Sequence, residues 1–436
     1  MKRLIVVLVG LLFGARVLAE EKKSLQECIE LALRHHPSLQ AGAARLKAAQ
    51  ARTRQVAAGY LPQIDATYAA NRRSTSVAAR TGTTLGTATQ TFNFFNTGVS
   101  FSQLLFDFGQ TFHSLQAAQA DADATWADLE TQREQVIWNV KQAYFALLTA
   151  QSLRDVAAEA VRQSEKHLDL ARGRYDVGLA PRLDVTREQT QLAANRLDLL
   201  RADNNIRLGR EVLRNALGLR EPVRFDLQEV RTPAPQSLDE DALVHRAWEL
   251  RPEILQLQAQ IRSAQEQVLA LERSHLPAVT AVGQYQWSGP DYPLQQNWNV
   301  GAAVTLPLFR GGLTVAQVEA AKQTAAALRH DVERTKQQIA LEVRQALLRL
   351  QEAAHSIEVA REGTQQARQT LDLAEGRYAT GVGNIIELTD AQTAFVSAKG
   401  QMIQSHYDYQ TALAALEKAV GSNLAPSDAA SKNPLE

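Results

Sequence analysis

The chain has 436 residues, of which 47 are basic and 47 acidic, so its formal net charge is zero. Hydrophobic residues make up 45% and charged residues 22%, a balance typical of folded proteins that argues against wholesale disorder. Zero net charge gives no support for nucleic-acid binding, which needs a basic field. The single cysteine, Cys28, excludes an internal disulfide framework and a CxxC metal site. Length alone suggests two or three domains.

Residues 1–19 are organised like a secretory signal peptide. Two basic residues precede an apolar run at 4–13, and Val17-Leu18-Ala19 resembles a cleavage site. Cleavage before Glu20 removes three basic residues and leaves a net charge of about −3. No later stretch reaches roughly 18 apolar residues, so we expect an exported protein that can cross a membrane only as β-strands.

The chain repeats itself at an offset of 203 residues. The segment 168–171 recurs as 371–374, and Arg174-Tyr175 recurs as Arg377-Tyr378. Such self-similarity indicates a duplicated architecture. We therefore divide the sequence into a signal peptide at 1–19, a first repeat at 20–218, a linker at 219–236, a second repeat at 237–421 and a polar tail at 422–436.

Two long spans lack proline, and within them the segments 109–174 and 312–377 are predicted to be uninterrupted helices. Each would be about 100 Å long, far longer than a globular helix, which favours a coiled coil. Apolar residues in both follow alternating spacings of four and three. The seams are Val136, Val140, Ala143, Leu147, Ala150, Ala157, Val161, Ser164, Leu168, Ala171 and Tyr175, interrupted at Arg154, and Ile339, Val343, Ala346, Leu350, Ala353, Ile357, Ala360, Thr364, Ala367, Leu371, Ala374 and Tyr378.

A return helix follows each long helix, with apolar residues at intervals of seven. The first carries Val185, Leu192, Leu199, Ile206 and Leu213, and the second carries Leu388, Phe395, Met402, Tyr409 and Leu416. We therefore predict two helical hairpins, 109–218 and 312–421. On the helices alone, a solvated coiled-coil structural protein of the cell envelope is an alternative.

The segments that precede the long helices alternate with period two, as strands do. They are 63–71, 94–105, 279–287 and 297–306, each near the 9–11 residues that a tilted strand needs to cross a bilayer. Four aromatic residues are candidates for the membrane interface: Tyr68, Tyr285, Trp287 and Trp298. A small soluble sandwich with one wet face is the alternative for any single strand.

The number of strands predicts an oligomer. A bilayer permits no open sheet edge, because an unpaired backbone group costs several kcal/mol in hydrocarbon. Since small barrels start at about eight strands, four strands cannot close one. One chain would therefore supply part of a barrel that other copies complete.

Several motifs in the chain recur in a known family. They are Arg174-Tyr175-Asp176-Val177-Gly178-Leu179, Leu183-Asp184-Val185, Leu105-Phe106-Asp107-Phe108-Gly109 and Ala216-Leu217-Gly218, with weaker second copies at 376–381 and 306–312. In their order, duplication and spacing, over about residues 24–421, the chain resembles the TolC-like outer-membrane efflux proteins.

The resemblance implies an α+β membrane protein, mostly α, that acts as a passive channel without cofactor or chemistry. Three copies would form a 12-stranded barrel in the outer membrane and an α-helical tunnel in the periplasm. The implied partners are outer-membrane lipid, a periplasmic adaptor, and an inner-membrane pump or secretion ATPase. Drugs, toxic ions or secreted polypeptides would be the substrates, chosen mainly by the inner-membrane partner.

The resemblance also implies two sites. Hairpin turns that contact the adaptor match Val177, Gly178 and Leu179 and, less closely, Gly381 and Val382; the alternative is that a turn simply needs glycine. A periplasmic gate matches the acids Glu387 and Asp390, three residues apart on one helix face, with a latch of Asp184 and Tyr378. Acids are also favoured at any helix start, which is the alternative for the gate. Gly383 stands where the resemblance leads one to expect an arginine, so the sequence does not predict a charged latch.

Other functions have less support from the residues. His35-His36-Pro37 invites a metal interpretation, but its counterpart Leu250-Arg251-Pro252 favours a shared structural turn. No Ser-His-Asp set or phosphate loop is present, so we expect no enzyme. The other alternative is that the chain is itself a periplasmic adaptor, but an adaptor would have a lipid or membrane anchor and a single helical hairpin.

Overall fold

The computed structural model describes residues 22–76, 89–230 and 238–421. The predicted signal peptide and polar tail lie outside these residues. The helices are α1 (Leu25–His35), α2 (Pro37–Ala57), the 3-10 turn η1 (Ala58–Tyr60), α4 (Gln110–Asp176), α5 (Arg182–Ala216), α6 (Glu240–Leu250), α7 (Pro252–Arg273), α8 (Leu313–Thr380) and α9 (Ile385–Val420). The strands are β1 (Lys22–Lys23), β2 (Gln63–Ser76), β3 (Thr89–Phe106), β4 (Asp226–Leu227), β5 (Ala278–Gly289) and β6 (Gln295–Thr305). The predicted class, α+β and mostly α, is confirmed.

The chain divides into two compact units. The hairpin unit comprises the residues up to Gln40, Thr131–Arg251 and the residues from Gln338. The strand unit comprises Ala41–Glu130 and Pro252–Gln337. The long helices α4 and α8 contribute residues to both units, so neither unit is a continuous piece of sequence.

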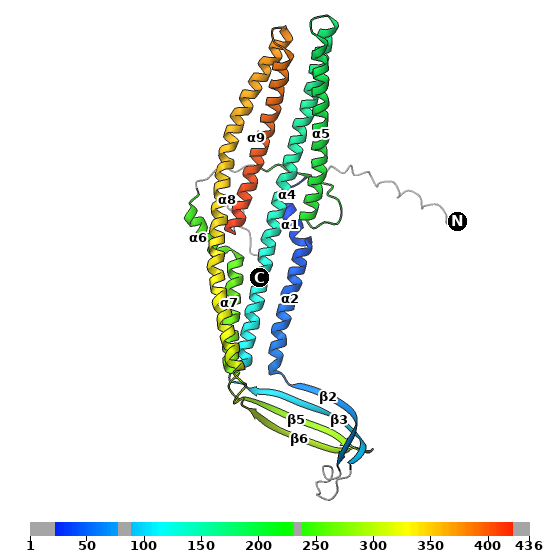
Figure 1. Cartoon of the computed structure of the whole chain (residues 1–436), viewed down its shortest axis with the longest axis vertical. Coiled ribbons are helices and arrows are strands. Elements are labelled where there is room, and N and C mark those ends of the chain that lie inside the picture. The colour runs from blue at the N-terminus through cyan, green and yellow to red at the C-terminus, as the bar shows by residue number, and fades with distance from the viewer. Residues whose placement is uncertain (1–21, 77–88, 231–237, 422–436) are drawn as a thin grey trace, which may run out of the picture. The chain divides into compact units, whose positions relative to one another are not determined.

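The strand unit contains one antiparallel sheet in the order β2-β3-β5-β6 (Figure 1). β2 and β3 pair from Gln63↔Ser102 to Ser76↔Thr89 and are longer than the predicted strands. Most of the added residues are polar in sequence, with Phe92 and Phe106 as exceptions, so period-two alternation does not reveal them. Gly98 is required by close packing, because a Cβ there would lie 2.6 Å from the Tyr285 carbonyl oxygen of β5.

The hairpin unit contains α5, α9 and the later parts of α4 and α8, so the α4–α5 and α8–α9 hairpins lie side by side there with both turns at one end (Figure 1). Most of the predicted seam is buried, including Val140, Leu147, Val343 and Leu371. Removing such side chains from water is the main favourable term for the hairpins. The prediction is wrong at Tyr175, which is 44% exposed, because no described segment covers this last turn of α4 as Arg174 covers the ring of the equivalent Tyr378.

The turn after α1 has a structural role. His36 ends α1 in an extended conformation, its Nδ1 lies 2.7 Å from the Ser38 hydroxyl, and Pro37 begins α2. Arg251 and Pro252 do the same between α6 and α7. The expected shared turn is therefore confirmed. Among the residues described, no group of three or more His, Cys, Asp or Glu side chains is placed to hold a metal ion. In the same residues, no helix has the length and apolar character of a membrane span.

Candidate functional site

The turn between α4 and α5 presents the first set of predicted adaptor-contact residues. The Leu179 N–H donates to the Arg174 carbonyl at 2.7 Å and the Gly178 N–H to the Tyr175 carbonyl at 2.9 Å. These are the two bonds of a Schellman motif, and Gly178 takes its left-handed position at φ +75°. Val177 and Leu179 are 68% and 70% exposed, so two apolar side chains stand outside the turn.

The turn between α8 and α9 is built in the same way. The Val382 N–H donates to the Arg377 carbonyl at 3.0 Å, and the Gly381 N–H to the Tyr378 carbonyl at 3.1 Å. Gly383 follows directly, and its N–H also donates to Arg377 at 2.9 Å. A Cβ on Gly383 would lie 2.9 Å from the Arg377 Cβ and 3.1 Å from the Tyr378 nitrogen. The turn therefore has no room for a side chain at 383, and an arginine there would require a different turn.

Two of the predicted gate residues, Asp184 and Tyr378, are in contact. The Tyr378 hydroxyl donates to Asp184 Oδ2 at 3.3 Å and joins α8 to α5. Burial, and then the charge of Asp184, raise the pKa of Tyr378 to about 12, so the hydroxyl keeps its proton and acts as the donor. The Arg174 guanidinium lies over the ring, 4.9 Å from its centroid, and also donates to the Tyr378 carbonyl. This contact joins one hairpin to the other.

The two predicted gate acids lie in the first turns of α9, and both are exposed. Glu387 is engaged within the chain: its Oε2 is 3.3 Å from Arg377 Nε, and its N–H is capped by the Asn384 side chain at 2.9 Å. Asp390 follows one turn later. Arg377, Glu387 and Asp390 together carry one net negative charge, because the first two compensate each other.

A buried polar layer between the hairpins was not predicted from the sequence. Its members are Ser164 and His167 of α4, Glu188 and Asn195 of α5, and Thr389 and Gln392 of α9, each less than 9% exposed. The Asn195 and Gln392 amides both donate to the Ser164 hydroxyl, at 2.6 and 3.0 Å. Glu188 and Asn195 lie between apolar seam residues of α5, which is the signal that could have revealed the layer.

The four predicted interface aromatics gather at one level of the sheet. Tyr68, Thr97 and Trp287 share one register row, and Val99, Tyr285 and Trp298 share the row two residues away. The Tyr285 and Trp287 rings meet edge to face at 4.7 Å. All four aromatics are exposed or half-buried. The register therefore brings residues from three strands into one aromatic band.

A second apolar band was missed from the sequence. It lies where the strands meet the long helices and contains exposed Phe106, Phe108, Phe112, Leu308 and Phe309. Leu308 and Phe309 are 88% and 85% exposed, which is costly for a surface in water. All of these residues except Phe112, which lies in the first turn of α4, belong to the Leu-Phe-Asp-Phe-Gly and Leu-Pro-Leu-Phe-Arg motifs. Their clustering before both helices was the available signal.

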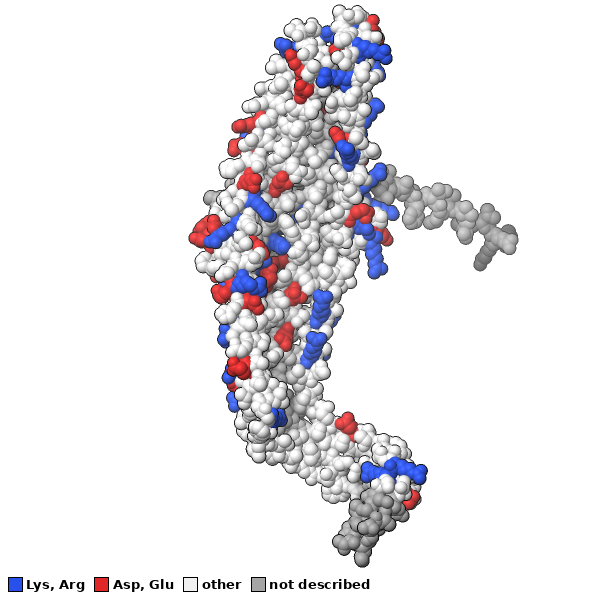
Figure 2. Space-filling view, viewed as in Figure 1, with Lys and Arg blue, Asp and Glu red and all other residues white. Residues whose placement is uncertain are grey.

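Charged residues are almost absent from the strands between these bands. The four strands hold only Asp65, Arg72 and Arg73, all in β2. Figure 2 shows the contrast on one face, where Lys, Arg, Asp and Glu are scattered over the helices and scarce on the sheet. A low charge density suits a hydrocarbon environment, in which each ionised side chain is costly.

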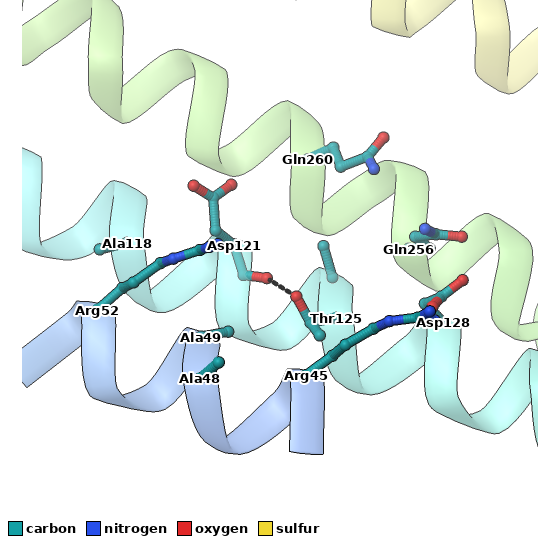
Figure 3. A pocket seen from close by; sticks show the side chains of 11 residues that line it. Arg45, Ala48, Ala49, Arg52, Ala118, Asp121, Thr125, Asp128, Gln256 and Gln260 are labelled. Atoms are coloured by element: carbon teal, nitrogen blue, oxygen red, sulfur yellow. Dashed lines mark hydrogen bonds between the residues drawn. The ribbon is translucent and has the colours of Figure 1, made fainter. Parts of the chain in front are cut away.

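The strand unit also has a groove of about 650 Å³ between α2, α4 and α7. Arg45 and Arg52 project from α2, and Asp121 and Asp128 from α4 (Figure 3). Small residues floor the groove, and the Thr125 hydroxyl is bound to the Asp121 carbonyl at 2.9 Å. The two charges of each sign balance, so the groove does not favour one class of ion.

Comparison with known proteins places this combination of sheet and hairpins in a family. The family model described as outer membrane efflux protein matches residues 28–219 and 243–422. The chain is 24% identical to outer membrane protein TolC of Escherichia coli (strain K12) over 446 residues, which covers 97% of this chain and 87% of TolC. It is 27% identical to protein CyaE of Bordetella pertussis over 408 residues, with coverage of 91% and 84%.

Solved structures share the fold. The CmeC outer membrane channel of Campylobacter jejuni matches with a TM-score of 0.77 at 21% identity, over 91% of this chain and 85% of CmeC. The open state of the MtrE outer membrane channel of Neisseria gonorrhoeae matches with a TM-score of 0.76 at 20% identity, over 92% and 89%. With the family model covering most of the sequence in two consecutive segments, the chain belongs to the outer membrane efflux protein family.

Proposed function

We propose that the chain is the passive exit channel of a tripartite efflux or secretion system, located in the outer membrane and extending into the periplasm. The observation that carries this proposal is a sheet with three charged residues whose two edge strands are each paired on one side only. That sheet continues into helices of 67 and 68 residues. A barrel wall that leads into a helical duct accounts for both features.

The open edges support assembly from three copies. β2 and β6 are the edges of the sheet, and pairing β6 of one copy with β2 of the next would close a 12-stranded barrel. In this proposal each repeat, 20–218 and 237–421, contributes one β-hairpin and one helical hairpin. The hairpins of the three copies would form the wall of the periplasmic duct.

The turns at the hairpin ends are the proposed contact with a periplasmic adaptor. Val177, Gly178 and Leu179 form one contact, and Gly381 with Val382 forms the other. Exposed apolar side chains on two similar turns offer matching surfaces. An inner-membrane pump or secretion ATPase would supply the energy and choose the substrate. The channel itself would perform no chemistry and need no cofactor.

The same end of the hairpin unit would hold the gate. Glu387 and Asp390 of three copies would place acids around the axis and favour cations. The contact between Asp184 and Tyr378 would hold each pair of hairpins together. Opening would require these contacts to separate.

The two apolar bands would mark the borders of the hydrocarbon layer. Tyr68, Tyr285, Trp287 and Trp298 form one border, and the second band begins beyond Leu306. The nine residues from Trp298 to Leu306 span about 26 Å along the strand, which is within the range of about 9–11 residues that a tilted strand needs to cross a bilayer. The proposed outer-membrane lipid contact therefore has the right dimension.

A matched pair of substitutions on β6 tests the membrane placement. Val300, 80% exposed, lies on the predicted lipid face, and Asn299 lies on the opposite face. Val300→Arg, two residues inside the border at Trp298, should cost about 1–2 kcal/mol of insertion free energy and reduce the outer-membrane yield. Asn299→Arg should insert normally and shift ion selectivity in planar bilayers toward anions. Equal insertion of both variants, or an unmodified chain found in the soluble periplasm, would contradict the proposal.

A further inference from the structure

The ring of His167 joins three helices of the hairpin unit. Its Nδ1 lies 3.0 Å from Gln392 Oε1 of α9, and its Nε2 lies 3.3 Å from Glu375 Oε1 of α8. The orientation of the Gln392 amide is fixed, because its nitrogen donates to the Ser164 hydroxyl. Both ring nitrogens of His167 therefore face acceptor oxygens. A neutral imidazole has a single N–H and can satisfy one of them, whereas an imidazolium satisfies both.

Glu188 of α5 is a second proton-binding group in the same layer. It is fully buried, its Oε2 has no hydrogen-bond partner among the described residues, and its Oε1 lies 3.1 Å from the Thr389 hydroxyl of α9. That hydroxyl also lies 2.7 Å from the Ile385 carbonyl. A hydroxyl has one hydrogen, so when Thr389 donates to Ile385, a bond to Glu188 requires a proton on the carboxyl. Burial raises the pKa of Glu188, and the Thr389 bond opposes this shift less strongly.

We propose that the junction between the two hairpins is a proton-dependent lock, tight when His167 is a cation and Glu188 is neutral, and looser when these protons leave. Both contacts cross from the α4–α5 hairpin to the α8–α9 hairpin. The lock regulates the opening of the gate, and its role in transport rests on the proposed channel function.

The direction in which the lock responds to pH follows from the charges that face His167 and Glu188. His167 faces Glu375 of α8, Glu188 of α5 and the neutral Gln392 of α9. When His167 loses its proton, the charge-assisted bond to Glu375 is lost and the single remaining N–H can serve only one of the two acceptors, so removal of this proton weakens the lock.

Glu188 acts in the same direction. It faces the charges of His167 on α4 and of Asp184 and Arg187 on its own helix, and the Tyr378 hydroxyl on α8. Since its pKa is raised when the hairpins are joined, its contribution is complete at low pH and is lost as pH rises. Rising pH therefore separates the hairpins, and acidification holds them together.

A distance measurement tests the lock without relying on conductance. Nitroxide labels are attached at Leu179→Cys and Val382→Cys, the exposed tips of the two turns, in assemblies that carry one labelled copy each. Cys28 does not compete for the label, because it is fully buried and burial raises its pKa to about 11. Between about pH 5 and pH 8, the fraction with separated tips should rise about tenfold.

Two variants and one control decide the assignment. Glu375→Gln, at a half-exposed position that leaves the core intact, should flatten the response by removing the charged acceptor. His167→Gln combined with Glu188→Gln should abolish it, because neither amide titrates. His355→Gln, an exposed histidine elsewhere on α8, should respond like the unmodified chain.

Conductance recordings of the same variants in planar bilayers distinguish a failure of the lock from a failure of the proposed channel function. If the unmodified chain shows no pH response in tip distance, or if the double variant keeps it, the lock is overturned whether or not the protein conducts. If the distances respond as expected but no variant forms conducting pores, the lock stands and the proposed channel function fails.

Discussion

Tyr378→Phe isolates the hydroxyl contact between the hairpins from the packing around it. The ring is 2% exposed and packs with Leu371, Ile385 and Leu388, while Arg174 lies over its face. Phenylalanine keeps these contacts. The substitution removes only the hydrogen bond to Asp184, whereas Tyr378→Ala would also open a cavity costing about 3–5 kcal/mol.

The expected magnitude follows from the geometry. Hydrogen bonds to charged groups contribute about 1.5–3 kcal/mol when well formed. The contact here is long, at 3.3 Å, and Asp184 is partly exposed, so about 1 kcal/mol per chain is expected. That is about a fivefold change per chain in the balance between joined and separated hairpins. If three copies open together, the effect on opening is about a hundredfold.

Single-channel recording measures this directly as the frequency of full openings. Tyr175→Phe is the control, because the equivalent tyrosine of the other hairpin is 44% exposed. A double-mutant cycle of Tyr378→Phe with Asp184→Asn should give a coupling of about 1 kcal/mol. If Tyr378→Phe opens as rarely as the unmodified channel, or no more often than Tyr175→Phe, the latch assignment is wrong.

The other predictions concern the sheet, the start of α4 and the gate. Gly98→Val should force β3 and β5 apart, destabilise the sheet by about 1–3 kcal/mol and lower the yield of folded protein. Gly301→Val is the comparison, because a Cβ there meets nothing within 4 Å in one chain. This variant should reduce only the amount of heat-resistant oligomer on gels. Asp107→Ala removes the carboxylate that accepts from two N–H groups at the start of α4 and should lower the free energy of unfolding in denaturant by about 1–2 kcal/mol. The gate cluster of Arg377, Glu387 and Asp390 carries one net negative charge, so Glu387→Gln or Asp390→Asn alone should abolish the preference for cations in reversal-potential measurements. The double variant should prefer anions. Unchanged ion selectivity would remove both acids from the gate.

Regular patterns in the sequence were sufficient to predict the architecture. They failed for polar residues that lie inside a strand or are buried between helices. Proline spacing and heptads located both long helices, since these features act over many residues. Strand lengths were underestimated because Arg72–Ser76 lacks alternation although it pairs with Thr89–Asn93. Glu188 was not singled out from the sequence, because burial of its carboxyl depends on a partner helix whose Thr389 is 201 residues away.

At the gate, the sequence marked Gly383 only as a departure from the related proteins. The structure supplies a steric reason for the glycine, because the end of α8 comes within 2.9 Å of its missing Cβ. Contacts of this kind depend on the exact path of a turn, which no residue spacing encodes. The Asp184–Tyr378 pair was reached by resemblance, and its geometry could be read only from the packed hairpins.

The two unpaired edges of the sheet have a genetic consequence. If β2 of each copy must pair with β6 of another, one copy with a blocked edge prevents barrel closure even when the two sound copies beside it have intact edges. In a cell that makes sound and edge-blocked chains in equal amounts, only about one assembly in eight would contain three sound copies. Loss of the protein would then be recessive, while an edge lesion such as a proline in β6 would be dominant over the intact allele.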